Sequence, residues 1–253
     1  MSTLILDRPN LAMRQEGAVL ALYENGARRG TVPVKLLERV VVQGSSFEFT
    51  SGAMLRLAEH GASVLFLSPR QSRQLAIVLG PGHNDATVRL AQFRLVSDAE
   101  ARQRWSLDLV RRKLRRQSAF LRHLREARRD CRKALTAGLR SIERIQRSMA
   151  GSTSTIEALR GSEGAAAAQY FKALASVFPP ALEFSGRNRR PPRDPVNACL
   201  SLAYTLLHFD AVRAAHTAGL DPLLGLYHRP AFGRESLACD LVEPLRPRID
   251  RWI

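Results

Sequence analysis

Three segments far apart in the chain carry side chains of the types that hold a divalent metal ion. Glu163 lies in RGSEGAAAAQYF, His228 ends GLDPLLGLYH, and Asp240 and Glu243 lie three residues apart in LACDLVEPLRP. Mg²⁺ and Mn²⁺ prefer oxygen ligands, and Mn²⁺ also accepts a histidine nitrogen. A metal ion held in this way neutralises charge on a phosphodiester and activates an attacking oxygen. The residue types therefore indicate a candidate site for metal-dependent phosphodiester chemistry.

Each of these residues, taken alone, has a structural interpretation as well. Glu163 is expected at the start of a helix, where a lone glutamate is usually a capping or dipole partner. His228 follows a turn-rich segment and alone is more often structural than a ligand. Asp240 and Glu243, at i and i+3, would share one helix face and could form a surface pair. Small or turn-forming neighbours surround all four, which favours the metal site when they are considered together.

The charge balance points to a polyanionic partner. The 253 residues include 39 basic and 23 acidic side chains, a formal net charge of +16. Such an excess indicates nucleic acid or an anionic membrane surface. The membrane is the weaker interpretation, because the sequence has no apolar run of about 18 residues and its first residues lack the hydrophobic centre of a signal peptide. We therefore expect a nucleic-acid partner and no membrane association.

Cysteine usage indicates a cytosolic location. The three cysteines, Cys131, Cys199 and Cys239, are odd in number, widely spaced and without a CxxC pattern. They favour reduced thiols over a zinc site or a disulfide framework.

Most of the excess positive charge lies between Arg102 and Arg147, which hold 16 basic and 4 acidic residues. Apolar residues recur there at helical spacing and predict a stripe that faces the core: Leu107, Val110, Leu114, Leu121, Leu124, Cys131, Leu135 and Ile142. The basic residues on the other faces could be an ordinary solvated surface. Unneutralised like charge favours DNA contact instead, with Arg111, Arg112 and Arg115 as candidates. Such phosphate contacts fix affinity and position and make binding dependent on salt.

A second basic cluster, Gly186–Arg193, reads GRNRRPPR and is predicted to be a loop by its glycine and prolines. Its DNA-binding candidates are Arg187, Arg189, Arg190 and Arg193; the alternative is a plain surface connector. Asp194 is expected to cap the next helix, with Pro195 at its first position.

The chain changes character near residue 85. Before it, short apolar runs separated by turn formers predict strands: Thr3–Leu6, Ala18–Tyr23, Leu36–Val42, Val64–Leu67 and Leu75–Leu79. One helix is expected over Ser51–His60, with Ser51 as N-cap and Gly61 as the stop. Pro81–Asp85 is predicted to be a linker, and nearly everything after it is helical in period. The sequence predicts an α+β protein, with a small β-rich amino-terminal domain (1–83) and a larger all-helical catalytic, DNA-binding domain (84–253).

Four segments, in this order, closely resemble a known family. They are RGSEGAAAAQYF, SGRNRRPPRDPVNACLSLAYTLL, GLDPLLGLYH and GRESLACDLVEPLRP, and they are similar to those of Cas1, the CRISPR-associated integrase and endonuclease that acquires spacers. The segments EGAVLALYENG, VPVKLLERVVVQG and SGAMLRLAEHGASVLFLS look like the family's β-domain, so the resemblance covers nearly the whole chain.

The resemblance implies a site, a reaction and partners. Its metal ligands carry over to Glu163, His228 and Glu243, with Asp240 as a supporting acidic residue and Mg²⁺ or Mn²⁺ as the ion. The implied reaction is transesterification, in which the 3′-hydroxyl of a captured prespacer duplex attacks a phosphodiester at the border of a CRISPR repeat. Related cleavage, including that of branched DNA, is also implied. The implied assembly is a homodimer through the β-domain, two of which flank a Cas2 dimer.

Two other functions remain open on the sequence. One is a non-catalytic DNA-binding scaffold subunit, and the other is a stand-alone structure-specific repair nuclease. Members of the resembled family commonly continue for several helical turns past the last motif, whereas this chain stops at Arg251-Trp252-Ile253. We therefore expect either a short subfamily or a shortened chain.

Overall fold

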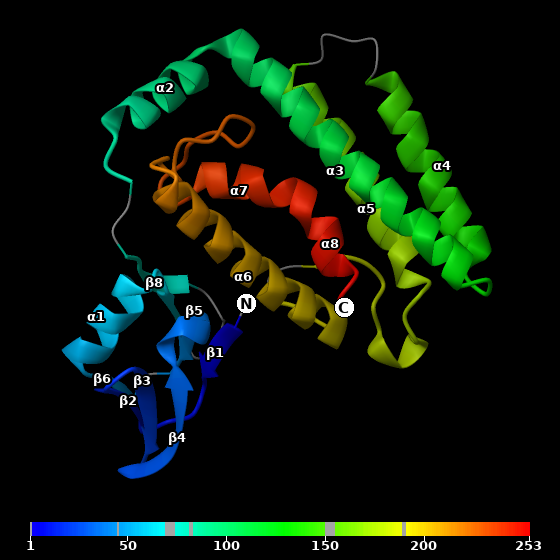
Figure 1. The fold of residues 1–253 in the computed structure, drawn as a ribbon. Coiled ribbons are helices and arrows are strands. Elements are labelled where there is room, and N and C mark those ends of the chain that lie inside the picture. Colours follow the sequence, from blue (N-terminus) through cyan, green and yellow to red (C-terminus); the bar gives the residue numbers. More distant parts are fainter. Residues whose placement is uncertain (1, 45, 69–73, 81–82, 150–154, 189–190) are drawn as a thin grey trace. The chain divides into compact units, whose positions relative to one another are not determined.

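The structure is a computed structural model that describes residues 2–44, 46–68, 74–80, 83–149, 155–188 and 191–253. The chain divides into two compact units, Met1–Asn84 with His216–Gly219 and Asp85–Ala215 with Leu220–Ile253. The predicted α+β class is confirmed, because strands fill the first unit and helices the second (Figure 1). The predicted domains 1–83 and 84–253, with dimerisation through the first, stay a prediction.

Two four-stranded sheets form the first unit. One has the order β1-β5-β7-β8 and the other the order β4-β3-β2-β6. In the first sheet β1, β5 and β7 run parallel and β8 returns antiparallel. In the second, β3 pairs antiparallel with β2 and β4, and β6 pairs parallel with β2. The strands are β1 (Ser2–Leu6), β2 (Leu11–Glu16), β3 (Val19–Glu24), β4 (Ala27–Pro33), β5 (Leu37–Gln43), β6 (Phe47–Phe49), β7 (Ser63–Leu67) and β8 (Gln74–Val78).

The two sheets share one apolar core with helix α1 (Ser51–Glu59). Met13 and Leu20 from one sheet, Val40 and Val64 from the other, and Leu57 from α1 are all buried in it. The helix begins as expected, but its N-cap is Thr50 and not Ser51. The Thr50 hydroxyl accepts a hydrogen bond from the Ala53 amide at 3.3 Å. Thr50 takes this place because its backbone is still extended, which the residue before a helix requires.

The five predicted strands are present, but three others were missed. Strand β4 reads ARRGTVP and is exposed along most of its length, so it lacks the apolar alternation by which a strand is recognised. Strand β2 (LAMRQE) turns polar after Met13, and β6 is only three residues long. All three belong to the sheet that has β4 at its edge. A short turn, η1 (Val34–Leu36), leads into β5.

Helices α3, α4 and α5 pack side by side in the second unit (Figure 1) and enclose its main core. The predicted stripe on residues 107–142 is confirmed: six members are buried, and Leu107 and Leu124 pack at the edge of this core. The helices of this unit are α2 (Ala86–Ser97), α3 (Ala99–Ala127), α4 (Arg132–Ser148), α5 (Ile156–Ala175), α6 (Pro195–Thr217), α7 (Ser236–Val242) and α8 (Arg246–Asp250), with short turns η2 (Pro180–Leu182) and η3 (Glu243–Leu245).

Capping side chains set the helix starts that position the site. Asp98 accepts from the Ala101 amide at 3.0 Å and begins α3. Thr155 accepts from the Ala158 amide at 3.2 Å and begins α5. Asp194 accepts from the Asn197 amide at 2.8 Å, so its predicted capping of α6 is confirmed, with Pro195 first in the helix.

The cysteines agree with the expectation from composition. All three cysteines are free, as predicted. Among the residues that the structure describes, no helix combines the length and apolarity needed to cross a membrane.

A glycine lets α4 approach α5 closely. A Cβ at Gly138 would lie 2.5 Å from the Ala173 Cβ and 3.3 Å from the Gln169 carbonyl oxygen. A side chain there would push the two helices apart, and the core beneath them would lose its packing.

We therefore expect Gly138→Ala to lower the free energy of unfolding by about 1–3 kcal/mol, the usual cost of overpacking. The matched control is Gly161→Ala on α5, where a Cβ meets no atom within 4 Å. It should raise the free energy of unfolding by about 0.5–1 kcal/mol, because alanine is the better helix former. Urea denaturation measures both; a neutral Gly138→Ala would contradict the packing described.

Candidate functional site

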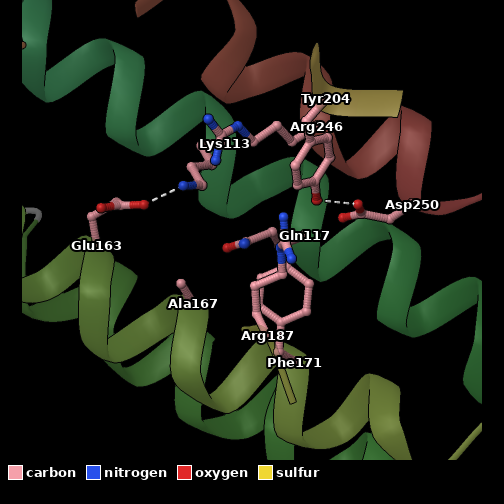
Figure 2. A pocket seen from close by; sticks show the side chains of 9 residues that line it. All are labelled: Lys113, Gln117, Glu163, Ala167, Phe171, Arg187, Tyr204, Arg246 and Asp250. Carbon is pink, nitrogen blue, oxygen red and sulfur yellow. Dashed lines mark hydrogen bonds and ion pairs between the residues drawn. The ribbon is translucent and has the colours of Figure 1, made fainter. Parts of the chain in front are cut away.

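A buried lysine joins two of the predicted acidic residues. The Lys113 ammonium, from α3, donates a hydrogen bond to Glu163 Oε1 of α5 and another to Glu243 Oε2 of η3, the latter at 2.5 Å. Lys113 is only 6% exposed. Two carboxylates from segments 80 residues apart are thus brought to one cation. Figure 2 shows the Lys113 side chain extending toward Glu163.

Glu243 is held in its ionised form. Burial alone would raise its pKa, but the Lys113 ammonium, the Arg246 guanidinium and the nearby His228 lower the pKa of Glu243 to about 2. The Arg246 guanidinium lies 3.3 Å from Glu243 Oε1. Arg116 of α3 also donates to the Pro244 carbonyl at 2.7 Å, so α3 holds the turn that carries Glu243 at a second point.

Asp240 organises the segment that carries His228. Its carboxylate is fully buried and accepts hydrogen bonds from three successive backbone amides, those of Leu226, Tyr227 and His228, at 2.7–3.0 Å. Asp240 Oδ1 also lies 2.7 Å from the His228 Nδ1. In the tautomer that donates Nδ1–H to Asp240, the other ring nitrogen, Nε2, keeps its lone pair and can bind a metal ion.

Close packing around Gly225 brings this segment against α7. A Cβ at Gly225 would lie 2.7 Å from the Ser236 carbonyl carbon and 2.8 Å from the His228 carbonyl oxygen. The buried amide of Gln92, on α2, fixes the preceding turn. It donates to the carbonyls of Asp221 and Leu224 at 2.9 and 3.0 Å and accepts from the Asp221 amide at 2.8 Å. The backbone that leads to His228 is thus held by Gln92 of α2 and packs against α7.

A small pocket adjoins the Lys113 ammonium (Figure 2). Its cavity volume is about 30 Å³, and its lining includes Gln117 from α3, Arg187, Tyr204 and Asp250. Asp250 accepts from Tyr204 and from the buried Tyr170, the latter at 2.7 Å. Burial raises the pKa of the Asp250 carboxyl, although these hydrogen bonds and the charges of Arg246 and Lys113 act against that rise.

Two polar atoms near the carboxylates lack hydrogen-bond partners among the described residues. They are the amide oxygen of Gln117 and the hydroxyl of Tyr227, both buried. Burial raises the pKa of Tyr227, and the negative charges of Glu163 and Glu243 raise it further. The hydroxyl therefore lies close enough to both carboxylates to sense their charge. Since buried polar groups are normally satisfied, these two atoms are open to hydrogen bonds with a further donor or acceptor.

The described residues include no group of three or more His, Cys, Asp or Glu side chains arranged to hold a metal ion. The Lys113 ammonium stands between the two glutamates. The donor set nevertheless fits a hard divalent ion, since it offers two carboxylates, one of them held ionised at a low pKa, and an imidazole nitrogen. A cation already occupies the space that both carboxylates face.

Two local expectations about these residues were wrong. Glu163 does not open a helix, because α5 begins at Ile156, which Thr155 caps. Its side chain is therefore not a capping group. Asp240 and Glu243 do not lie on one α-helix either: α7 ends at Val242, and Glu243 begins the turn η3, where Pro244 follows. Asp240 contacts the 226–228 backbone and Glu243 contacts Lys113, so they are not a surface pair.

Sequence reasoning missed Lys113. In an arginine-rich helix it looks like one more surface cation. The available signal was its position: Val110, Lys113, Gln117 and Leu121 recur at three- and four-residue spacing on the buried side of α3. A lysine and a glutamine on an apolar helix face predict a buried polar site.

The predicted DNA-binding arginines differ in what they contact. Arg112 and Arg115 are exposed on α3, and Arg112 pairs with Asp108 at 2.7 Å. Arg111 donates to the Met149 carbonyl at 2.9 Å, which caps the end of α4.

In the second basic cluster, Arg187 turns inward to Asn197 and Ser201 at 2.8 and 3.1 Å and stacks over the Tyr204 ring. Arg193 is exposed. Arg189 and Arg190 lie outside the described residues. A phosphate-binding role for these arginines stays a prediction.

Comparison with known proteins decides the family. The family model described as CRISPR associated protein Cas1 matches residues 4–253. This chain belongs to the Cas1 family. A CRISPR-associated endonuclease Cas1 from Thermodesulfovibrio yellowstonii is 39% identical over 257 residues, which cover all of this chain and 79% of the relative. The chain is therefore a CRISPR-associated enzyme of the endonuclease class, and a scaffold subunit or repair nuclease is not favoured.

Solved structures share the fold. One, a casposase bound to integration product, superposes with a TM-score of 0.80 at 23% identity, covering 99% of this Cas1 chain and 71% of that chain. Another, from a Cas6-RT-Cas1–Cas2 complex, superposes with a TM-score of 0.76 at 25% identity, covering 99% of this chain and 27% of that one.

The contacts of Asp240 generate a stability prediction. Asp240→Ala leaves three buried backbone amides without an acceptor, so we expect it to lower the free energy of unfolding by at least about 3 kcal/mol. Asp98→Ala removes one capping bond at an exposed helix start and should cost about 1 kcal/mol. Urea denaturation compares the two; equal losses would mean that Asp240 does not support the 226–228 backbone.

Proposed function

We propose that this chain joins and cleaves DNA strands with Mg²⁺ or Mn²⁺ held by Glu163, Glu243 and His228. The observation that carries the proposal is the convergence of α5, η3 and the 226–228 segment. Two carboxylates from distant segments share one cation, and the neighbouring His228 contributes to the low pKa of Glu243. This is the donor set of a hard divalent ion in a protein whose charge favours a phosphodiester substrate.

Each side chain has a separate task in this proposal. Glu163 and Glu243 supply anionic oxygens, and Glu243 stays ionised because its pKa is low. His228 supplies Nε2, and Asp240 holds the imidazole in the tautomer that leaves this nitrogen free to ligate. A protonated imidazole cannot ligate, so acidic pH should weaken metal binding. Asp240 itself already accepts four hydrogen bonds, which suits it to positioning rather than ligation.

The ion, when bound, supplies Lewis-acid activation of the scissile phosphate and of the attacking hydroxyl. The remaining residues shape the surroundings. Tyr227 is buried beside the carboxylates and limits the access of water. Arg160 donates to the Tyr227 carbonyl at 2.8 Å and lies over the Tyr227 ring, and both contacts hold Tyr227 in place. The attacking group is the 3′-hydroxyl of a prespacer duplex, and the target is a CRISPR repeat border; branched DNA is a substrate for the related cleavage.

The partners follow from charge and from similarity. The basic surfaces of α3 and α4, with the Gly186–Arg193 loop, would hold DNA by its phosphates and leave sequence choice to DNA shape and to partner proteins. A similar chain occurs in a Cas6-RT-Cas1–Cas2 complex. We extend this to the present chain as a homodimer formed through the β-rich unit, two of which would flank a Cas2 dimer.

Removal of a metal ligand should abolish catalysis and spare DNA binding. We expect Glu163→Ala and His228→Ala each to reduce Mn²⁺-dependent strand joining by about 10³-fold or more, because the metal's contribution to charge stabilisation is lost. Glu126→Ala and His123→Ala change the same residue types at exposed positions of α3 and should retain activity. The measurement is half-site integration of a labelled fragment, with duplex binding followed in parallel. Full activity in both ligand variants would refute the assignment.

Removal of exposed arginines should affect affinity and its salt dependence. Each lost phosphate contact should reduce the slope of log K against log salt by about 0.9, so Arg112→Ala with Arg115→Ala should reduce it by about 1.8. The control is Arg28→Ala with Arg29→Ala on β4, which removes the same charge from exposed positions of the other unit. Fluorescence anisotropy with a duplex at several salt concentrations measures the slope. An equal change in both pairs would indicate a general charge effect and no α3 interface.

A further inference from the structure

Lys113 has the contacts that the metal ion would have. Its ammonium donates to one oxygen of Glu163 and one of Glu243, the two carboxylates proposed as ligands. The residue is 6% exposed and the Glu243 side chain 8%, so these charges have little water to screen them. The Glu163 side chain is 21% exposed, yet two carboxylates brought this close, one of them buried, need a cation between them. In this structure that cation is Lys113.

We propose that Lys113 is a placeholder for the metal ion and withdraws into the adjoining pocket when the ion binds. This inference rests on the proposed function, since it concerns the same two carboxylates. A divalent ion and an ammonium cannot both sit between Glu163 and Glu243, because like charges at that distance repel strongly where water is scarce. The lysine stem is long and flexible, so its charge can move while the backbone of α3 stays in place.

The pocket beside the ammonium offers a place for the displaced charge. Gln117 lies one helical turn after Lys113, and side chains four residues apart on a helix are neighbours. Its amide oxygen is buried and lacks a partner among the described residues, so it can accept from the ammonium. Figure 2 shows the Gln117 side chain among the residues that line the pocket.

The carboxylate of Asp250 would attract the displaced Lys113 ammonium into the pocket. Its hydrogen-bond partners among the described residues are the neutral hydroxyl groups of Tyr170 and Tyr204. The charge of Arg246, which also lines the pocket, and that of Lys113 from its present position both act on this carboxyl. A shift of the ammonium toward Asp250 would bring a buried cation to a buried anion, while the divalent ion takes over the two glutamates. Glu163, Glu243 and Asp250 then each lie near a positive charge, both with and without the divalent ion.

The test is a double-mutant cycle on metal affinity. Lys113→Met keeps the length of the side chain and removes its charge, and Gln117→Leu removes the acceptor in the pocket. Lys133→Met is the matched control, because Lys133 is exposed on α4. Mn²⁺ binding to the full chain without DNA is measured by calorimetry for the wild type, the two single variants, the double variant and the control.

Lys113→Met should bind Mn²⁺ about tenfold more tightly than the wild type, since the ion no longer competes with an ammonium. Gln117→Leu should bind it about fivefold more weakly, because the displaced charge loses its acceptor. In the double variant the effect of Gln117→Leu should disappear, and Lys133→Met should match the wild type. Thermal unfolding adds a second readout: without metal, Lys113→Met should melt at a lower temperature than the wild type, and saturating Mn²⁺ should restore it.

Unchanged or weaker Mn²⁺ binding in Lys113→Met would overturn the inference and would leave the metal site itself standing. Should Lys113→Met fail to fold, Gln117→Leu decides, and wild-type affinity in that variant overturns the inference. Failure of the proposed function has a different signature, in which Glu163→Gln and His228→Asn bind Mn²⁺ as tightly as the wild type.

Discussion

The second unit is arranged around the repulsion of two neighbouring carboxylates, the buried Glu243 and the partly buried Glu163. They come from segments far apart in sequence, and their approach in a site with little water needs a cation. Lys113 meets this need from the middle of α3, the longest of the described helices. The burial of its charge is tolerable only because both carboxylates accept from it. One ammonium therefore links η3 and α5 to the same point of α3.

Other contacts around Lys113, Glu163 and Glu243 fix the backbone of the elements that carry them. Arg116 and Arg246 hold the turn η3 on either side of Glu243, one through a backbone carbonyl and the other through the carboxylate. Asp250 ties α8 to α5 and α6 through two tyrosine hydroxyls. The carboxy-terminal elements thus carry one proposed ligand while several independent contacts fix their backbone. A metal-dependent enzyme needs this rigidity, since small displacements of its ligands reduce the rate strongly.

The sequence predicted the two units and the candidate site to different extents. The stripe from Leu107 to Ile142 could be recognised because burial imposes a helical period on apolar residues. Strand β4 could not, because an exposed edge strand has no such period. The four acidic and histidine residues stood out by type, but their contacts did not. Thr155, eight residues before Glu163, decides that α5 starts early, and nothing in RGSEGAAAAQYF reveals it. Lys113 was missed because a charge buried by tertiary contacts has no local sequence signal beyond its helical position.

The way Asp240 binds three consecutive amides has an energetic consequence for any ligand of His228. A loop folded around a buried carboxylate has already lost its conformational entropy during folding. An incoming ion therefore meets an imidazole that is already aimed, and little of its binding free energy is consumed in ordering the chain. This is the opposite of small zinc domains, whose chain folds only as the metal arrives.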